Sequence, residues 1–264
     1  MRKPLRTGYT TGACAAAAAK GAALMLARQE PVNEVTILLP ADVSATFALH
    51  GQAFAPDAAA CYVIKDAGDD PDVTNGAEVH ARVTVAPPPL MGGGRGEGEA
   101  ARGNSDGDSS APPTPALPHE GGGRIFISGG TGIGKATKPG LAVAPGEWAI
   151  NPVPRRMIEQ AVRAVFPKGT LGVEISIPDG EQRAQRTLNA RLGIVGGLSI
   201  LGTSGIVRPI SAKAWTDTID AALDVARACG CPTVVLSTGR TSELAAQRHL
   251  EYPPPLMGGG EGEG

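Results

Sequence analysis

A segment of 37 residues, 87–123, limits what this chain can fold into, because it separates two parts that each contain apolar patterns. It reads PPPLMGGGRGEGEAARGNSDGDSSAPPTPALPHEGGG, and 17 of its residues are glycine or proline. Because the segment has few apolar side chains, burying them cannot offset the conformational entropy lost when the backbone is ordered. We therefore expect this segment to be disordered. The chain ends in a similar phrase, PPPLMGGGEGEG at 253–264. We interpret both pieces as low-complexity sequence, the first inserted between two strands.

Composition excludes several classes of protein. The 264 residues include 26 acidic and 24 basic side chains, a balance that predicts no nucleic-acid partner and no anionic membrane surface. No apolar run reaches the roughly 20 residues of a membrane span, and the first residues lack the apolar core of a signal peptide. The cysteines Cys14, Cys61, Cys229 and Cys231 have neither zinc nor redox spacing. We therefore expect a cytoplasmic protein with reduced, buried thiols and no metal site.

The ordered remainder predicts an α/β fold. Aromatic residues make up only 3% of the chain, so the core must be built from Val, Ile, Leu and Ala. A threonine start and an alanine-rich body predict a helix over 11–29, and an apolar stripe predicts another over 155–166. Short β-rich runs predict strands at 35–40, 46–50, 61–65, 77–86, 124–128 and 171–178. We expect these elements to form an α+β domain over 1–190, interrupted at 87–123.

From about residue 190 the pattern changes to that of a Rossmann-like domain. An apolar run at 192–205 ends in glycines, a helix is expected over 211–230, and PTVVLSTGRTSE at 232–243 reads as a buried strand with a polar exit. This order is typical of a β–α–β unit in a parallel sheet. Two strands make an incomplete sheet, so we expect a truncated α/β domain over 191–252, followed by the low-complexity tail 253–264. Its exposed edge would favour a homo-oligomer.

The stretch GGTGIGKATKPG, residues 129–140, nearly matches a phosphate-binding P-loop. Gly129, Gly134 and Lys135 fall in place, but Ala136 stands where the pattern needs a hydroxyl for Mg²⁺. The loop must also run into a helix, and Pro139 arrives too early for one. We interpret the stretch as a glycine turn and keep a P-loop phosphotransferase as an alternative that ATP binding would reveal.

Hydroxyl side chains gather before the first helix, in RTGYTTGAC at 6–14. One threonine is explained as an N-cap, where its hydroxyl accepts a backbone N–H group. Thr7, Thr10 and Thr11 together exceed that need. An anion site at the helix start is therefore the second interpretation.

Acidic side chains gather in KDAGDDPDVTNGAE at 65–78. Asp66, Asp69 and Asp70 lie between glycines and a proline, directly after an apolar strand. Such aspartates can simply be a solvated turn that hydrogen-bonds its own backbone. Alternatively they form a site, in which a buried subset would have raised pKa values suited to proton transfer. The spacing does not fit an EF-hand.

Basic side chains recur between these motifs. Arg155 and Arg156 lie in the first turn of the helix expected at 155–166, where the helix dipole disfavours cations. Lys135 and Lys138 are in the preceding glycine turn. The group suggests that carboxylates are bound.

Four long phrases carry a resemblance to a known family. They are LRTGYTTGACAAAAAKGAA, VIKDAGDDPDVTNGAE, GGTGIGKATKPGLAVAPGEWAINPVPRRMI and TLNARLGIVGGLSILGTSGIVRPIS. Together they resemble the CbiD family of anaerobic cobalamin synthesis, over most of 5–86 and 124–250. The resemblance implies methyl transfer from S-adenosylmethionine to ring carbon C-1 of cobalt-precorrin-5B, giving cobalt-precorrin-6A, with cobalt present only as part of the corrinoid substrate.

The family pattern continues beyond the point where this chain turns into its tail. We therefore expect weak or no turnover from the chain alone. A catalytically silent protein that still binds corrinoid or S-adenosylmethionine is the alternative reading.

The chemistry of the side chains, set beside this reaction, suggests three groups of site residues. Asp66, Asp69 and Asp70 are expected to manage a proton or to face the positive charge of the donor. Carboxylates of the substrate would be bound by Thr10, Thr11, Lys65, Lys135, Lys138, Arg155 and Arg208. Because ligands of parallel sheets collect at the carboxyl ends of strands, the donor is expected at Gly197, Gly202, Thr203, Gly205, Thr238 and Gly239.

Overall fold

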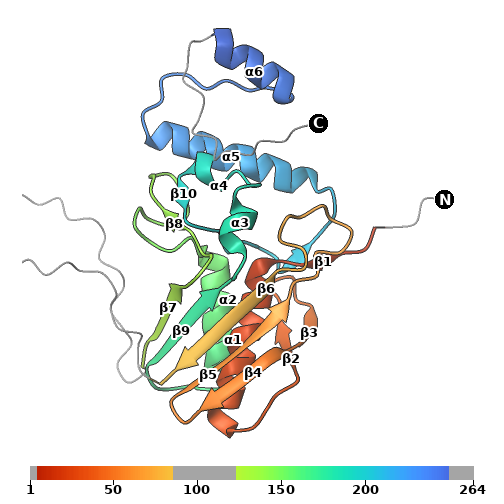
Figure 1. The fold of residues 1–264 in the computed structure, drawn as a ribbon, viewed down its shortest axis with the longest axis vertical. Helices are drawn as coiled ribbons and strands as arrows, with labels where there is room; N and C mark the ends of the chain where they lie inside the picture. Colours follow the sequence, from red (N-terminus) through yellow and green to blue (C-terminus); the bar gives the residue numbers. More distant parts are fainter. Residues whose placement is uncertain (1–4, 86–122, 250–264) are drawn as a thin grey trace, which may run out of the picture.

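The computed structural model describes residues 5–85 and 123–249, and its centre is a mixed sheet of five strands (Figure 1). The strand order is β4-β5-β6-β9-β7. The first four strands are antiparallel neighbours, and β7 pairs with β9 in parallel. Their bounds are β4 (His50–Ala55), β5 (Ala58–Ile64), β6 (Glu78–Thr84), β7 (Ile125–Gly129) and β9 (Leu171–Ser176). The predicted α/β class is confirmed, whereas the expectations for 87–122 and for the tail lie outside the described residues.

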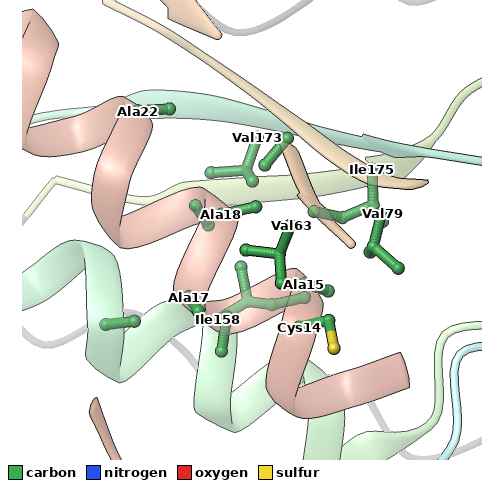
Figure 2. Packing of buried hydrophobic residues seen from close by; sticks show 14 of the residues in the cluster. Cys14, Ala15, Ala17, Ala18, Ala22, Val63, Val79, Ile158, Val173 and Ile175 are labelled. Atoms are coloured by element: carbon green, nitrogen blue, oxygen red, sulfur yellow. The ribbon is translucent and has the colours of Figure 1, made fainter. Parts of the chain in front are cut away.

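Helix α1 (Thr11–Arg28) lies against this sheet and is itself covered by α2 (Pro152–Arg163) (Figure 1). The five consecutive alanines of α1, residues 15–19, are at most 1% exposed. Their small side chains let neighbouring elements approach the helix backbone from several sides. Figure 2 shows Val63 and Val173 of the sheet and Ile158 of α2 gathered around this helix. Both helices predicted from the sequence are thereby confirmed, α2 beginning three residues earlier than expected.

A two-stranded hairpin adds to the same core. It consists of β2 (Glu34–Leu38) and β3 (Ser44–Ala48), which pair antiparallel. Alternation along both strands turns Val35, Ile37, Ala45 and Phe47 inward. The period of two expected of a half-buried strand is therefore present, as the sequence predicted.

Two short ladders join the later part of the chain to this core. One pairs β1 (Gly8–Tyr9) with β11 (Ile206–Val207), and the other pairs β8 (Lys135–Ala136) with β10 (Ile194–Val195). Between them, Leu198 and Ile200 are buried in the same hydrophobic cluster as α1. Residues 194–207 thus pack with the first part of the chain, and the domain boundary near 190 stays a prediction.

The remaining elements are helices: α3 (Gly180–Ala184), α4 (Asn189–Leu192), α5 (Ala212–Ala228) and α6 (Arg240–His249). The prediction of a helix over 211–230 is confirmed by α5. The prediction of a buried strand within 232–243 is wrong, because residues 232–236 form no strand and Leu236 is 75% exposed. An extended segment becomes a strand only by pairing its backbone with a neighbour, and the described residues provide none there. The parallel pair of this fold is instead β7 and β9.

The glycine turn at 129–140 has a packing role. Gly132 has a φ of +74°, and a Cβ atom built on it would lie 1.9 Å from the carbonyl oxygen of Ile177. Gly180 and Gly197 also approach the Gly132 backbone so closely that a Cβ on either would meet its carbonyl oxygen at 2.3 Å. Lys135 is the first residue of the short strand β8, and no helix follows it before α2, so the geometry of a P-loop is absent from this described stretch.

None of the helices within 5–85 and 123–249 combines the length and the apolar character needed to cross a bilayer.

Replacing Gly132 should separate close packing from backbone strain. We expect Gly132→Ala to lower the free energy of unfolding by more than about 3 kcal/mol, because left-handed strain and overpacking add. The matched control is Gly146→Ala, which has a φ of +89° but nothing within 4 Å of the added Cβ, and should cost only about 1–2 kcal/mol. Urea unfolding of both variants measures the difference, and equal losses would contradict the packing role.

Candidate functional site

Three segments distant in sequence meet at the N-terminus of α1: residues 6–12, 65–76 and 201–210. The Tyr9 N–H group donates to the Asp66 carbonyl oxygen at 2.7 Å, and the Thr10 N–H group donates to the Gly205 carbonyl oxygen at 3.1 Å. The Gly12 N–H group donates to the Leu201 carbonyl oxygen at 2.9 Å. We call this meeting point the α1 loop cluster. It brings together three of the motifs that the sequence singled out.

The hydroxyl groups before α1 have partners within the protein. Thr10 Oγ1 accepts the N–H group of Ala13 at 3.2 Å, which confirms an N-cap. Thr11 Oγ1 accepts the Leu201 N–H group at 3.1 Å and lies 3.3 Å from the Leu201 carbonyl oxygen, to which it donates. Gly202 approaches so closely that a Cβ on it would lie 2.3 Å from Thr10 Oγ1. These contacts favour the capping interpretation, and anion binding by Thr10 and Thr11 stays a prediction.

The three predicted catalytic aspartates do lie in this cluster. Asp66 forms an ion pair with Arg6, whose Nη2 is 2.9 Å from Asp66 Oδ1. Asp69 Oδ2 accepts the backbone N–H group of Arg6 at 2.6 Å. Asp70 Oδ1 accepts the N–H group of Ile210 at 3.0 Å. The acidic turn therefore ties the segment before α1 to the segment after β11.

The pKa of Asp66 bears on the two roles that the sequence left open for the acidic turn. Hydrogen bonds from the Arg6 guanidinium, and then from the Gly68 N–H group, hold the pKa of the Asp66 carboxyl below its ordinary value. Asp66 is exposed and paired, so it does not belong to the buried subset for which raised pKa values were expected. An ionised carboxylate here is suited to face a cation rather than to carry a proton.

Arg6 was missed by the sequence analysis. It lies 60 residues from Asp66, so only the fold brings the two side chains together. The available signal was its position beside RTGYTTG, within a phrase that already carried the family resemblance.

Lys65, the first residue of the acidic turn, is buried and forms an ion pair within the turn. Its side chain is buried, and Nζ lies 2.6 Å from Asp72 Oδ2. Asp72 Oδ1 accepts both the N–H group and the hydroxyl of Thr74, at 2.7 and 2.6 Å. Burial alone would raise the pKa of Asp72, but the Lys65 ammonium and the Thr74 hydrogen bonds outweigh it and leave this pKa lowered. The predicted contact of Lys65 with substrate stays a prediction, since its ammonium is already paired.

The cysteines divide into two pairs. Cys14 and Cys61 are buried free thiols, and burial raises the pKa of each to about 12. They are the inert thiols that the sequence predicted. Cys229 and Cys231 are exposed, so the same expectation is wrong for them. They follow the end of α5 and precede residues 232–236, where the strand predicted from the sequence does not form.

The basic residues predicted to bind carboxylates, Lys135, Lys138 and Arg155, contact other parts of the protein outside the α1 loop cluster. Lys135 Nζ is 4.4 Å from the centre of the Trp148 ring, a cation–π contact. Lys138 Nζ donates to the Arg191 carbonyl oxygen at 3.2 Å. The Arg155 guanidinium donates to the carbonyl oxygens of Ile150, Ile127 and Trp148, at 2.8, 3.3 and 3.3 Å. Desolvation lowers the pKa of Arg155.

The contacts of Lys135 and Arg155 hold the chain at Trp148 and Ile150 in place, and Lys138 is bound to the backbone at Arg191. Binding of carboxylates by Lys135, Lys138 and Arg155 therefore stays a prediction that the geometry does not favour. Arg208 is exposed just after β11, within the segment 201–210 of the α1 loop cluster.

The predicted donor residues are split between two places. Gly202, Thr203 and Gly205 belong to the α1 loop cluster, whereas Gly197 packs on Gly132 and its carbonyl oxygen accepts from Asn189 Nδ2 at 3.1 Å. Thr238 and Gly239 precede α6, which lies on the far side of α5 from β1 and β11 (Figure 1). The Gly239 carbonyl oxygen there accepts the Ser242 hydroxyl at 2.8 Å. The structure thus brings together half of the predicted donor set.

Metal-ligating side chains do not cluster in the described ranges. Within 5–85 and 123–249 there is no group of three or more His, Cys, Asp or Glu side chains placed to hold an ion.

An alanine-rich helix between a mixed sheet and a second helix, with glycine- and aspartate-rich loops at its N-terminus, defines an α/β protein with one polar loop cluster. The CbiD family model matches residues 1–209, so this chain belongs to the CbiD family. The cobalt-precorrin-5B C(1)-methyltransferase of Pelobacter propionicus is 65% identical over 247 residues, which cover 94% of this chain and 56% of that protein. The protein of the same name from Geobacter metallireducens is 59% identical over 248 residues, covering 92% and 60%.

A solved structure is also similar. The crystal structure of a cobalamin biosynthesis protein (CbiD) from Archaeoglobus fulgidus superposes with a TM-score of 0.50 at 28% identity, covering 96% of this chain and 70% of that one. The chain described here thus spans a little over half the length of the two methyltransferases above.

Removing the Asp72 carboxylate should change stability in a pH-dependent way. Its folded pKa is lowered, so its contribution is present above the unfolded value of about 3.9 and is lost as pH falls through the folded value. We expect Asp72→Asn to lower the free energy of unfolding at pH 7 by about 3 kcal/mol, because Lys65 is left buried and unpaired. Below about pH 4 the difference from the wild type should shrink.

The control for this prediction is Asp217→Asn, which breaks the exposed pair of Lys213 and Asp217 on α5. That change should cost less than about 0.5 kcal/mol. Thermal unfolding from pH 3 to 7 measures all three proteins. A difference between wild type and Asp72→Asn that stays constant over this range would refute the proposed coupling.

Proposed function

We propose that this chain methylates ring carbon C-1 of cobalt-precorrin-5B with S-adenosylmethionine, giving cobalt-precorrin-6A in anaerobic cobalamin synthesis. Family membership and the names of the two bacterial relatives support the reaction. The observation in the fold that carries it is the α1 loop cluster, where three polar segments meet around an ionised Asp66. Cobalt enters as part of the substrate.

The main contribution of the protein to this reaction is to position the methyl donor and the acceptor carbon. The bond between sulfur and the methyl carbon breaks as the bond from that carbon to C-1 forms, and the electron pair of the broken bond stays on sulfur. The donor leaves as the neutral thioether S-adenosylhomocysteine, and its positive charge passes to the corrinoid product until a proton is lost. Such a step gains most from holding donor and acceptor in line.

Asp66 is the residue of the cluster best suited to the donor. Its carboxylate is ionised and exposed, and the sulfonium or ammonium group of S-adenosylmethionine would share it with the Arg6 guanidinium. The sulfonium charge falls as the methyl group leaves, so this attraction is stronger in the ground state than in the transition state. Asp66 should therefore affect donor affinity more than turnover. Asp69 and Asp70, whose oxygens accept backbone N–H groups, would position this turn.

We expect Asp66→Asn to weaken S-adenosylmethionine binding about tenfold, equal to about 1.4 kcal/mol, with turnover at saturating donor changed only a few-fold. The matched control is Asp57→Asn, an exposed aspartate just before β5, at the opposite end of this strand from the acidic turn. Its donor affinity should equal that of the wild type. Calorimetric titration and initial rates measure the two quantities, and a loss confined to turnover would contradict the electrostatic role.

The reaction itself is tested by incubating the chain with cobalt-precorrin-5B and methyl-labelled S-adenosylmethionine. We expect a labelled corrinoid one methyl group heavier by mass spectrometry. Its yield should be lower than with the Pelobacter propionicus relative, because this chain spans 56% of that protein. Binding of both ligands without any product would favour the catalytically silent alternative, and tight ATP binding lost in Lys135→Ala would favour a phosphotransferase.

A cytoplasmic location and a homo-oligomeric state belong to the same proposal. The free thiols Cys14 and Cys61 are compatible with a reducing compartment. The exposed side chains of Trp215 and Leu236 are surfaces that a second copy would cover.

A further inference from the structure

A groove of about 650 Å³ lies between α1, α2 and the hairpin formed by β2 and β3. Its floor is apolar and comes from all three elements, with Ala16 of α1, Leu39 of the hairpin and Met157 of α2 each at most 6% exposed. The space exists because the facing positions of the helices are small: Ala16 on α1, and Ala161 and Ala164 on α2. Larger side chains there would fill it.

Two cations stand at the walls of this groove. Lys20 follows Ala16 by one helical turn, and its Nζ donates to the Thr36 carbonyl oxygen at 2.7 Å, which holds the ammonium beside the hairpin. Arg156 lies in the first turns of α2, where the helix dipole does not stabilise a positive charge. Asp42, in the turn of the hairpin, is the acidic side chain among the lining residues. The lining thus carries more positive than negative charge.

The groove adjoins the α1 loop cluster. Thr203, from the loop 201–205 that caps the N-terminus of α1, is also part of its lining. A ligand held in the groove would therefore reach Thr203, one of the residues at which the donor is expected. Neither Lys20 nor Arg156 belongs to the cluster itself.

We propose that this groove binds the carboxylate-bearing edge of the corrinoid substrate, with the ring edge on the apolar floor and peripheral carboxylates at Lys20 and Arg156. This inference rests on the proposed function. The periphery of such a macrocycle alternates methyl groups with carboxylate chains, which matches an apolar floor beside cations. S-adenosylmethionine carries two cationic groups, which Lys20 and Arg156 would repel. The volume suits one edge of a large ligand in an open groove.

The test uses cobyrinic acid, a stable cobalt corrinoid with free carboxylates, and its methyl ester as a neutral counterpart. Binding to the 264-residue chain is followed by the visible absorption of the corrin. We expect Lys20→Gln and Arg156→Gln each to weaken binding of the acid about five-fold, the scale of one exposed ion pair, and together about twenty-fold. The ester should bind weakly and respond to neither change.

Three further variants test the interpretation. Lys213→Gln and Arg227→Gln remove the same charges from α5, outside the groove lining, and should leave the affinity for the acid unchanged. Ala164→Trp fills the groove from an exposed position of the helix end, so the fold should persist, and we expect it to abolish binding of the acid. Circular dichroism confirms that each variant is folded.

Wild-type affinity for the acid in the double variant and in Ala164→Trp would overturn the proposal. So would failure of the wild-type chain to bind the acid at millimolar concentration, or loss of S-adenosylmethionine binding in the groove variants with the corrinoid unaffected. Methyl transfer is scored separately. Absence of transfer with groove-dependent corrinoid binding would reject the proposed reaction alone, and transfer that is indifferent to the groove variants would reject the groove alone.

Discussion

Close packing around the alanine run of α1 is the constraint on which the rest of this structure depends. Residues 15–19 are almost completely excluded from solvent, because α1 is in contact with the sheet and with α2. An alanine offers little apolar area, so the stability gained here comes from many short contacts and not from large side chains. The same small residues that bring these layers together leave the groove beside α2 unfilled.

The position of α1 also decides where the polar loops can meet. Its first turn is buried at one end of the sheet, and its backbone donors are used by the loop at 201–205 and by Thr10. The acidic turn follows β5, which packs directly on α1, so the aspartates reach the same end. A helix fixed in the core therefore places three separate loops at the same end of the sheet. Arg6 and Lys65 then set the charge of the aspartates from opposite sides, one exposed and one buried.

The sequence predicted the elements that depend on a local pattern of residues. It did not predict features that depend on strand pairing or on a charge that is distant in sequence. Alanine content and the apolar stripe with Met157 and Ile158 were sufficient for α1 and α2, and alternation was sufficient for β2, β5 and β6. The run at 232–236 has the composition of a strand, but composition does not supply the neighbour that a strand needs. The charge state of Asp66 could not be predicted because Arg6 is remote in sequence. Long phrases shared with the CbiD family carried more information about function than any single motif. Of the residues that line the groove, the sequence had singled out Arg156 as a basic side chain that could bind a carboxylate, but not the apolar floor beside it.

The register of the central sheet has a consequence for how the chain is connected. Thr84 of β6 and Phe126 of β7 both pair with Gly172 of β9, from its two sides. These two strand ends are therefore separated by two inter-strand spacings, about 10 Å, at the same edge of the molecule. Within the described residues, both of these strand ends pair with β9. The chain could accordingly be divided there into two fragments, one carrying β4, β5 and β6 and the other carrying β9 and β7, and reassembly would be driven by β9 pairing with the free edge of β6.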